Sequence, residues 1–197
     1  PIRSEIWGMI FPGLPEKAAE YAYMDAVIDH AEASVWIEMY YAAMESMAFF
    51  ESDIQTLIKG QLHYLPEDSE PHKCVELMLE AYSEGGVDWK KARTRLMRKF
   101  AHFDFSNSIT NLGILLIALL YGEGDLDKTI NIAFRCGYDT DCNCATAGAI
   151  LGIILGADKI PEKLKEMVGD TFVVGIDVKR ENSSIRALSK ETCQIGL

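Results

Sequence analysis

Apolar residues recur at spacings of three and four along almost the whole chain, which is the pattern of helices that bury one face. The clearest case runs through Trp36, Tyr40, Met44 and Met47. Residues suited to helix starts precede the periodic stretches: Pro15, Asp29 with Glu32 as a capping box, Ser52 or Asp53, Ser69, Asp88 and Asp125. We therefore predict an all-α fold, a compact multi-helix bundle that forms a single domain over residues 1–197.

Departures from the helical pattern are few. After a short helix that ends near Val168, the tail contains Val173, Val174, Ile176 and Val178, for which a short extended piece is predicted.

Glycines recur every four residues at Gly148, Gly152 and Gly156 on a helix rich in alanine. Such a small-sided face lets another backbone approach closely, so we predict a tightly packed neighbour there.

Charge and hydropathy exclude several classes of partner. Nineteen Lys and Arg against thirty Asp and Glu give a net charge of -11, which repels nucleic acid and anionic membranes. The longest apolar runs, 112–121 and 147–155, fall short of the roughly 20 residues that cross a bilayer. The first residues lack the layout of a signal peptide, and five scattered cysteines favour a reducing compartment. We predict a cytoplasmic protein that binds neither nucleic acid nor membrane.

The segment Asp139-Thr140-Asp141-Cys142 carries the clearest chemical signal, because it places two carboxylates two residues apart just before a helix. Carboxylates at this spacing converge when the backbone between them is a loop entering a helix. Hard oxygen ligands suit Mg²⁺ or Mn²⁺. The same residues also suit a helix cap, in which Asp139 or Asp141 stabilises the helix dipole. The motif alone leaves both interpretations open.

The thiols offer a different hypothesis. Cys136, Cys142 and Cys144 lie close together in sequence and could bind zinc or act in redox chemistry. Their spacing contains no Cys-x-x-Cys pair, and no second cluster completes a tetrahedral site. A small zinc or redox module is therefore the less favoured of the interpretations.

Residues 137–152 resemble the carboxy-terminal signature of the ADP-ribosylglycohydrolase family, in which Gly-Gly-Asp-Thr-Asp-Thr-Asn-Ala precedes a Gly/Ala-rich helix. Residues 118–125 resemble the helix and turn before that signature, and Ile160-Pro161 resembles the turn after it. Residues 6–30 resemble the family's middle region. The resemblance thus covers nearly the whole chain.

By this resemblance, the fold is an all-α bundle with a binuclear magnesium site. The implied activity is hydrolysis of the bond that joins ADP-ribose, through its distal ribose C1, to a protein side chain or another leaving group. Asp139 and Asp141 match two metal ligands, and Cys142 stands where the family has a Thr or Ser hydroxyl ligand. Mn²⁺ is an alternative ion, and Asp141 is the residue to which we assign the catalytic proton transfer.

Three further residues are candidates for substrate binding. His30 matches a family position near the substrate, Tyr138 replaces a Gly at the rim, and Asn111 precedes a helix from which it could reach the same cleft. Each also has an ordinary structural interpretation, as a helix-start histidine, a packed aromatic ring and a capping or core amide.

One element of the family pattern is missing from the sequence. The family carries its other metal ligands in an amino-terminal Asp-Asp-Thr stretch, which these 197 residues do not contain. The resemblance therefore implies the carboxy-terminal part of a longer enzyme, truncated at the amino terminus and inactive alone, whose partners are an ADP-ribosyl substrate and either the missing half or a second copy. The alternative is a non-catalytic relative, comparable to the crystallins of this family.

Overall fold

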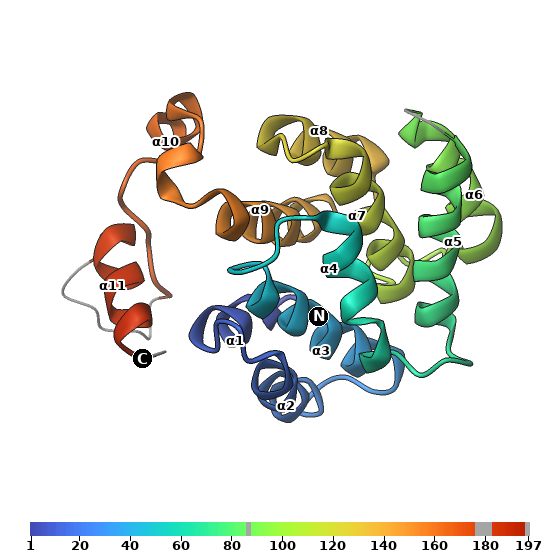
Figure 1. The fold of residues 1–197 in the computed structure, drawn as a ribbon, viewed down its shortest axis with the longest axis horizontal. Coiled ribbons are helices and arrows are strands. Elements are labelled where there is room, and N and C mark those ends of the chain that lie inside the picture. Colours follow the sequence, from blue (N-terminus) through green and yellow to red (C-terminus); the bar gives the residue numbers. More distant parts are fainter. Residues whose placement is uncertain (86–87, 176–182, 196–197) are drawn as a thin grey trace.

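The chain folds into α-helices in the computed structural model, which describes residues 1–85, 88–175 and 183–195 (Figure 1). The helices are α1 (Ser4–Ile10), α2 (Pro15–Ala26), α3 (Ala33–Met47), α4 (Ile54–Gly60), α5 (Glu70–Gly85), α6 (Trp89–Phe100), α7 (Ser108–Gly122), α8 (Leu126–Cys136), α9 (Thr140–Leu155), α10 (Glu162–Val168) and α11 (Ile185–Ile195), with short 3-10 turns at Leu62–Tyr64 and Ala157–Lys159. Among the described residues, β-pairing is limited to one isolated bridge, Thr171 with Ser184. The predicted all-α fold is confirmed.

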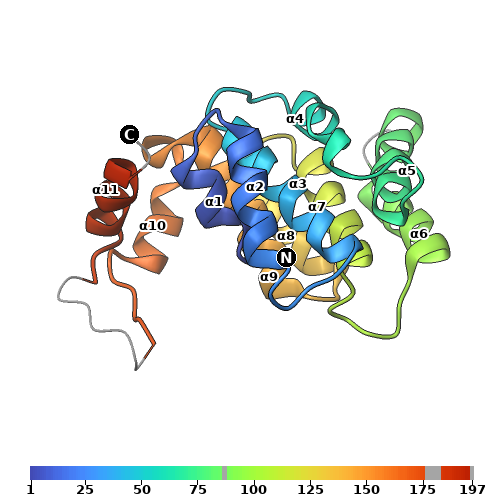
Figure 2. The same ribbon diagram turned by 90° about the horizontal axis from the view of Figure 1, so that it is seen from below.

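Helix α7 is the centre of the bundle. Every residue from Thr110 to Gly122 is buried, so the helix is enclosed on all sides. It packs against α3, α5, α6, α8 and α9, and the end-on view in Figure 2 shows it between these neighbours. The nearly continuous apolar run 112–121 is thus explained by burial on every face.

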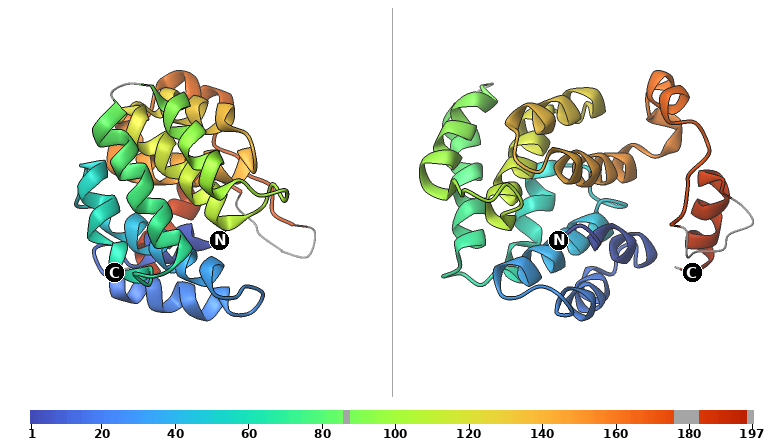
Figure 3. Two further views of the ribbon diagram at one scale, coloured as in Figure 1. Left: turned by 90° about the vertical axis from the view of Figure 1, so that its right-hand side faces the viewer. Right: turned by 180° about the vertical axis from the view of Figure 1, so that it is seen from behind.

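The remaining helices surround α7 in two groups. Helices α1 and α2 pack on α3 on one side, whereas α5 and α6 form an antiparallel pair on the other (Figures 1 and 3). Helices α10 and α11 stand apart at the left of Figure 1, and α11 contacts α1. Neither contains a buried residue. An extended piece is not found at Val173 and Val174, which belong to no strand or bridge, whereas the isolated bridge lies just before them at Thr171. Ile176 and Val178 lie outside the described residues.

Most of the predicted helix starts are confirmed, with one exception. The side chains of Asp53, Asp88 and Asp125 each accept a backbone N–H of the helix that follows. The capping box at Asp29 and Glu32 is wrong: α3 begins at Ala33 without a side-chain cap, and Glu32 has a positive φ of 47°. The reason is that the carboxylate of Asp29 is bound by Arg3 instead.

The prediction of a tightly packed glycine face on α9 is also wrong. A Cβ at Gly152 or Gly156 would meet nothing within 4 Å, because this side of α9 is only partly covered. The close approaches occur elsewhere. A Cβ at Gly8 would overlap with Glu45, and one at Gly122 would overlap with Thr129. Glycine therefore permits the contacts of α1 with α3 and of α7 with α8.

Candidate metal and ligand site at the start of helix α9

The acidic motif lies in a tight turn that delivers the chain from α8 into α9. Gly137 and Tyr138 have positive φ values of 78° and 62°, and the helix begins at Thr140. Asp139 occupies the cap position, yet its side chain makes no capping hydrogen bond. Asp141 is in the first helical turn and not in the predicted loop. The carboxylates converge because Asp139 alone lies outside the helix.

Three potential ligand atoms come together in this turn. One carboxylate oxygen each of Asp139 and Asp141 and the sulfur of Cys142 all lie within 4.8 Å of one another. Among the described residues, this is the one such group of His, Cys, Asp or Glu side chains. The side chain of Asp139 does not cap α9, so the capping interpretation does not explain its position, whereas Asp141 lies in the first turn, where its charge also stabilises the helix dipole.

Asn111, at the start of α7, fixes the position of the Asp139 turn. Its Oδ1 accepts the Asp139 backbone N–H at 3.2 Å and the Asn143 Nδ2 at 2.8 Å. Its Nδ2 donates to the carbonyls of Phe105 at 2.8 Å and Asn107 at 3.0 Å. Both donors and both acceptor positions of the amide are thus occupied. In this arrangement Asn111 positions the turn, and no hydrogen-bonding capacity remains for a ligand.

Tyr138 fastens the same turn to the loop that precedes α7. Its hydroxyl accepts the His102 backbone N–H at 3.3 Å and donates to the His102 carbonyl at 3.1 Å. A left-handed conformation costs a residue with a Cβ about 1 kcal/mol, so the contacts of Tyr138 have to offset that cost. The ring packs against the core. Like Asn111, Tyr138 therefore acts first as a structural link.

The thiols do not form a zinc site. Cys136 is buried and Cys144 donates to the Ile130 carbonyl, so only Cys142 joins the carboxylates. Burial, together with a hydrogen bond to Asp139 and the nearby negative charge, raises the pKa of Cys142 to about 11. Burial raises the pKa of Cys136 to about 12. Thiolates are the form that binds zinc and attacks disulfides, so these environments oppose a zinc or redox function.

A small hollow adjoins the acidic turn. Its volume is about 30 Å³, which is enough to hold ordered water. The lining comes from the first two residues, α3, the start of α7 and the start of α9: Pro1, Ile2, Tyr41, Ser106, Ser108, Asn111, Leu115, Asp139, Cys142, Asn143 and Thr146. Segments far apart in the sequence thus meet at Asp139 and Cys142.

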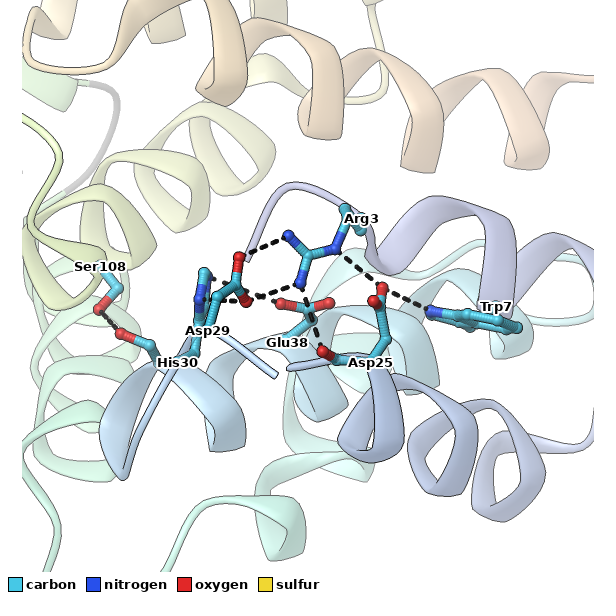
Figure 4. Close-up of polar contacts among 8 residues, drawn as sticks. Arg3, Trp7, Asp25, Asp29, His30, Glu38 and Ser108 are labelled. Carbon is cyan, nitrogen blue, oxygen red and sulfur yellow. Dashed lines mark hydrogen bonds and ion pairs between the residues drawn. The ribbon is translucent and has the colours of Figure 1, made fainter. Parts of the chain in front are cut away.

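His30 belongs to a second polar cluster, between α1, α2 and α3 (Figure 4). Arg3 is at its centre: Nε bonds Asp25 at 2.9 Å, and both terminal nitrogens bond Asp29. The Arg3 guanidinium lowers the pKa of Asp29. The imidazole of His30 lies between two carboxylates, with Nδ1 2.9 Å from Asp29 and Nε2 3.9 Å from Glu38.

Two buried carboxylates on α3 were missed by the sequence reasoning. Glu38 and Glu45 are both fully buried, and both oxygens of Glu38 and one of Glu45 have no hydrogen-bond partner. Ser4 donates to the other oxygen of Glu45 at 3.2 Å. Glutamate at a core position of a helix was the available signal, since Glu38 and Glu45 are seven residues apart and so share one face.

Glu45 makes the stability of the fold depend on pH. Burial, and then the charge of Glu5, raise the Glu45 pKa well above its ordinary value of 4.5. The folded state therefore holds a proton that the unfolded state releases above about pH 4.5. The free energy of unfolding consequently falls as the pH rises from about 4.5 towards the raised pKa of Glu45. We expect Glu45→Gln to remove this pH dependence. The free energy of unfolding of the variant, minus that of the wild type, should then grow by about 1.4 kcal/mol for each pH unit. Urea unfolding of both proteins at pH 5 and pH 8 measures the effect. The prediction is contradicted if the free energies of unfolding of variant and wild type differ by the same amount at both pH values.

Comparison with known proteins identifies one family. A model of the ADP-ribosylglycohydrolase family matches residues 1–192. No curated protein and no solved structure matches the chain significantly. None of the described helices combines the length and the apolar character that a membrane crossing requires.

Proposed function

Since the chain belongs to the ADP-ribosylglycohydrolase family, we propose that it hydrolyses the bond between the distal ribose C1 of ADP-ribose and a leaving group, with Mg²⁺ as cofactor. The leaving group is a protein side chain or a small molecule. The observation that carries the proposal is the convergence of Asp139, Asp141 and Cys142 at the start of α9.

The donor set fits a hard divalent ion at two of its three positions. Asp139 and Asp141 provide carboxylate oxygens, which are the ligands that Mg²⁺ and Mn²⁺ prefer. Cys142 fits less well, because a protonated thiol is a poor ligand for Mg²⁺. Bound ions of this kind supply positive charge that holds ribose hydroxyls. The binuclear site needs further ligands, for which the family uses an Asp-Asp-Thr stretch outside these residues.

The residues of this chain have separable roles in the proposal. Cleavage at an anomeric carbon develops positive charge on the ribose ring, which the carboxylates of Asp139 and Asp141 stabilise. Asp141 is exposed and accepts the proton of the attacking water. Asn111 and Tyr138 keep the turn in place, and His30 hydrogen-bonds the ligand from the α3 side.

The direct test is release of ADP-ribose from an ADP-ribosylated protein when this protein is added. We expect release with Mg²⁺ or Mn²⁺, and loss of release in EDTA that added Mg²⁺ restores. A protein that binds neither ion and releases no ADP-ribose would instead be a non-catalytic relative. That alternative draws support from Cys142, which replaces a hydroxyl ligand of the family.

A further inference from the structure

The loop between α6 and α7, residues 101–107, presents two phenylalanine rings to solvent, and we call it the aromatic loop. Phe103 is 97% exposed and Phe105 is 64% exposed. Figure 2 shows the loop at the outer edge of the bundle, beyond the end of α6. Phenylalanine is a residue that folding normally buries, so two exposed rings two positions apart form an apolar patch that contact with a partner would cover.

Hydrogen bonds within the aromatic loop keep its backbone in one conformation. The Asp104 carboxylate accepts the Ser106 N–H at 2.9 Å and the Ser106 hydroxyl at 2.8 Å. Nδ1 of His102 accepts the Asp104 N–H at 3.1 Å, and the His102 ring lies 4.4 Å from the Phe103 ring, measured between centroids. The loop is therefore ordered before a partner arrives, which reduces the entropy lost on binding.

The aromatic loop adjoins the acidic turn at two points. The Tyr138 hydroxyl bonds both backbone groups of His102. The side chain of Asn111 joins the Phe105 carbonyl to the Asp139 N–H, so a single amide group separates the loop backbone from the turn. A protein whose modified side chain enters the candidate site would bring its neighbouring residues against the aromatic loop.

The end of α6 that leads into the aromatic loop is positively charged. Helix α6 carries six of the nineteen Lys and Arg residues of a chain whose net charge is -11. Arg95 pairs with Glu80 and Glu84 of α5. Arg98 and Lys99, in the last turn, are exposed and form no ion pair with a described residue. Carboxylates of a partner would complement these two charges.

A protein segment fits this surface better than a polynucleotide or a small leaving group does. Aromatic and arginine side chains are the types that dominate the energetics of protein–protein contacts. A polynucleotide is repelled by the net charge of the chain and by the carboxylates of Asp139 and Asp141 beside the loop. A small leaving group ends close to the reacting bond, so it gives the loop nothing to bind.

We propose that Phe103 and Phe105, together with Arg98 and Lys99, bind the apolar and acidic residues that flank the modified side chain of a protein substrate. This proposal rests on the proposed function, which supplies the ADP-ribosyl group. It makes the leaving group a side chain in acidic surroundings. The contacts that it adds lie outside the ADP-ribosyl group and do not involve a metal ion.

The test compares three conjugates that share the same bond to ADP-ribose. The first carries ADP-ribose on a single amino acid, the second on a peptide with leucine and glutamate flanks, and the third on the same peptide with lysine in place of glutamate. We expect this protein to have a KM for the acidic peptide about 10-fold or more below its KM for either of the others, because only that peptide matches both the rings and the cations. The kcat should be the same for all three.

Removing either phenyl ring should weaken recognition of the acidic peptide alone. We expect Phe103→Ala and Phe105→Ala to raise its KM by about 10-fold, as for a central aromatic contact, and to change the KM of the amino-acid conjugate by less than about 2-fold. Phe50→Ala is the matched control. Phe50 is 73% exposed and follows α3, which spans about 22 Å from its start beside Ser108, so its removal should leave every KM unchanged.

Reversing one charge tests the acidic character of the partner. Arg98→Glu should raise the KM of the acidic peptide and lower that of the basic peptide. Lys59→Glu, at an exposed position on α4, changes the net charge of the protein by the same amount and should alter neither. Added salt should weaken the preference of the wild type for the acidic peptide and have less effect on Arg98→Glu. Thermal unfolding establishes that each variant is folded.

Several outcomes would overturn the proposal. Equal losses for all three conjugates would show that the rings contact the ADP-ribosyl group itself. Displacement of the acidic peptide by a single-stranded oligonucleotide would assign the surface to nucleic acid, and a change of oligomeric state in Phe103→Ala would assign it to contact between copies of the chain. A wild type that does not distinguish the two peptides refutes the proposal outright.

Failure of the proposed function gives a different result. If no conjugate releases ADP-ribose, the hydrolase function is refuted, and binding of the unmodified acidic peptide, measured by fluorescence anisotropy, still tests the surface. Binding that Phe103→Ala and Arg98→Glu both weaken supports the surface without the hydrolase activity. Absence of binding, or binding that neither variant changes, refutes the surface as well.

Discussion

Replacing Asp141 with Asn is expected to lower the release of ADP-ribose by about 10³-fold and to abolish measurable Mg²⁺ binding, while the helices stay folded. The size of the effect follows from losing a carboxylate that acts both as a ligand and in proton transfer, either of which is worth about 10²-fold or more. Asp141 is exposed and makes no structural hydrogen bond in the described residues, so the fold loses only a favourable charge in the first turn of α9. Calorimetry with Mg²⁺ and the release assay measure the two effects.

Helix α8 offers a matched control. Asp127 occupies the second position of α8, as Asp141 does in α9, and is likewise exposed. Asp127→Asn removes the same charge from the same helical position, so it should reproduce any change in stability and leave activity and Mg²⁺ affinity unaltered. Unchanged Mg²⁺ affinity in Asp141→Asn would contradict the assignment of Asp141 as a ligand.

Much of the helical framework could be predicted because its signals are local. The apolar spacing along α3 and the Asp caps at Asp53, Asp88 and Asp125 depend on residues within a few positions of one another. Helices α1 and α11 were not predicted. Helix α1 has only seven residues, and it owes its stability to Arg3 and Gly8, whose partners lie on other helices.

The sequence could predict the ligand residues of the candidate site, but not the residues that hold them in position. Neighbours in sequence bring the ligand atoms of Asp139, Asp141 and Cys142 together, so the motif reveals them. The link from Asn111 to Asp139 joins residues 28 positions apart, and spacing cannot indicate it. The same holds for the wrong capping box at Asp29, because the local pattern gives no sign that Arg3 competes for that carboxylate.

The same argument explains why Glu38 was missed. Helical periodicity places residues on a common face but does not say what covers that face. An isolated Glu among apolar residues on α3 is compatible with a solvated position, and it is buried only because other segments of the chain pack on α3. Buried carboxylates therefore have to be found in the structure, where an unmet hydrogen-bonding requirement distinguishes them from ordinary surface charges.

Removing the side-chain amide of Asn111 is expected to damage both stability and metal binding, because one side chain joins three segments around the turn. Asn111→Ala leaves the Asp139 N–H and the Asn143 amide without their acceptor, and Asn143 is buried. Leaving such groups unpaired costs about 2–3 kcal/mol, measurable by urea unfolding. With the turn released, the ligand atoms of Asp139 and Asp141 are no longer held together, so Mg²⁺ affinity should fall by about 10-fold.

Two further variants show whether Asn111 acts by position or only through stability. Asn131 on α8 makes a similar bond to a backbone carbonyl four residues earlier, but it is exposed and remote from the turn, so Asn131→Ala should alter neither quantity. Asn111→Asp keeps an acceptor for Asp139 and Asn143 while losing the donors to Phe105 and Asn107. If Asn111 positions the turn, Asn111→Asp should bind Mg²⁺ better than Asn111→Ala even when both are similarly destabilised. If Asn111→Asp and Asn111→Ala have the same Mg²⁺ affinity but different stabilities, Asn111 stabilises the fold and does not position the ligands.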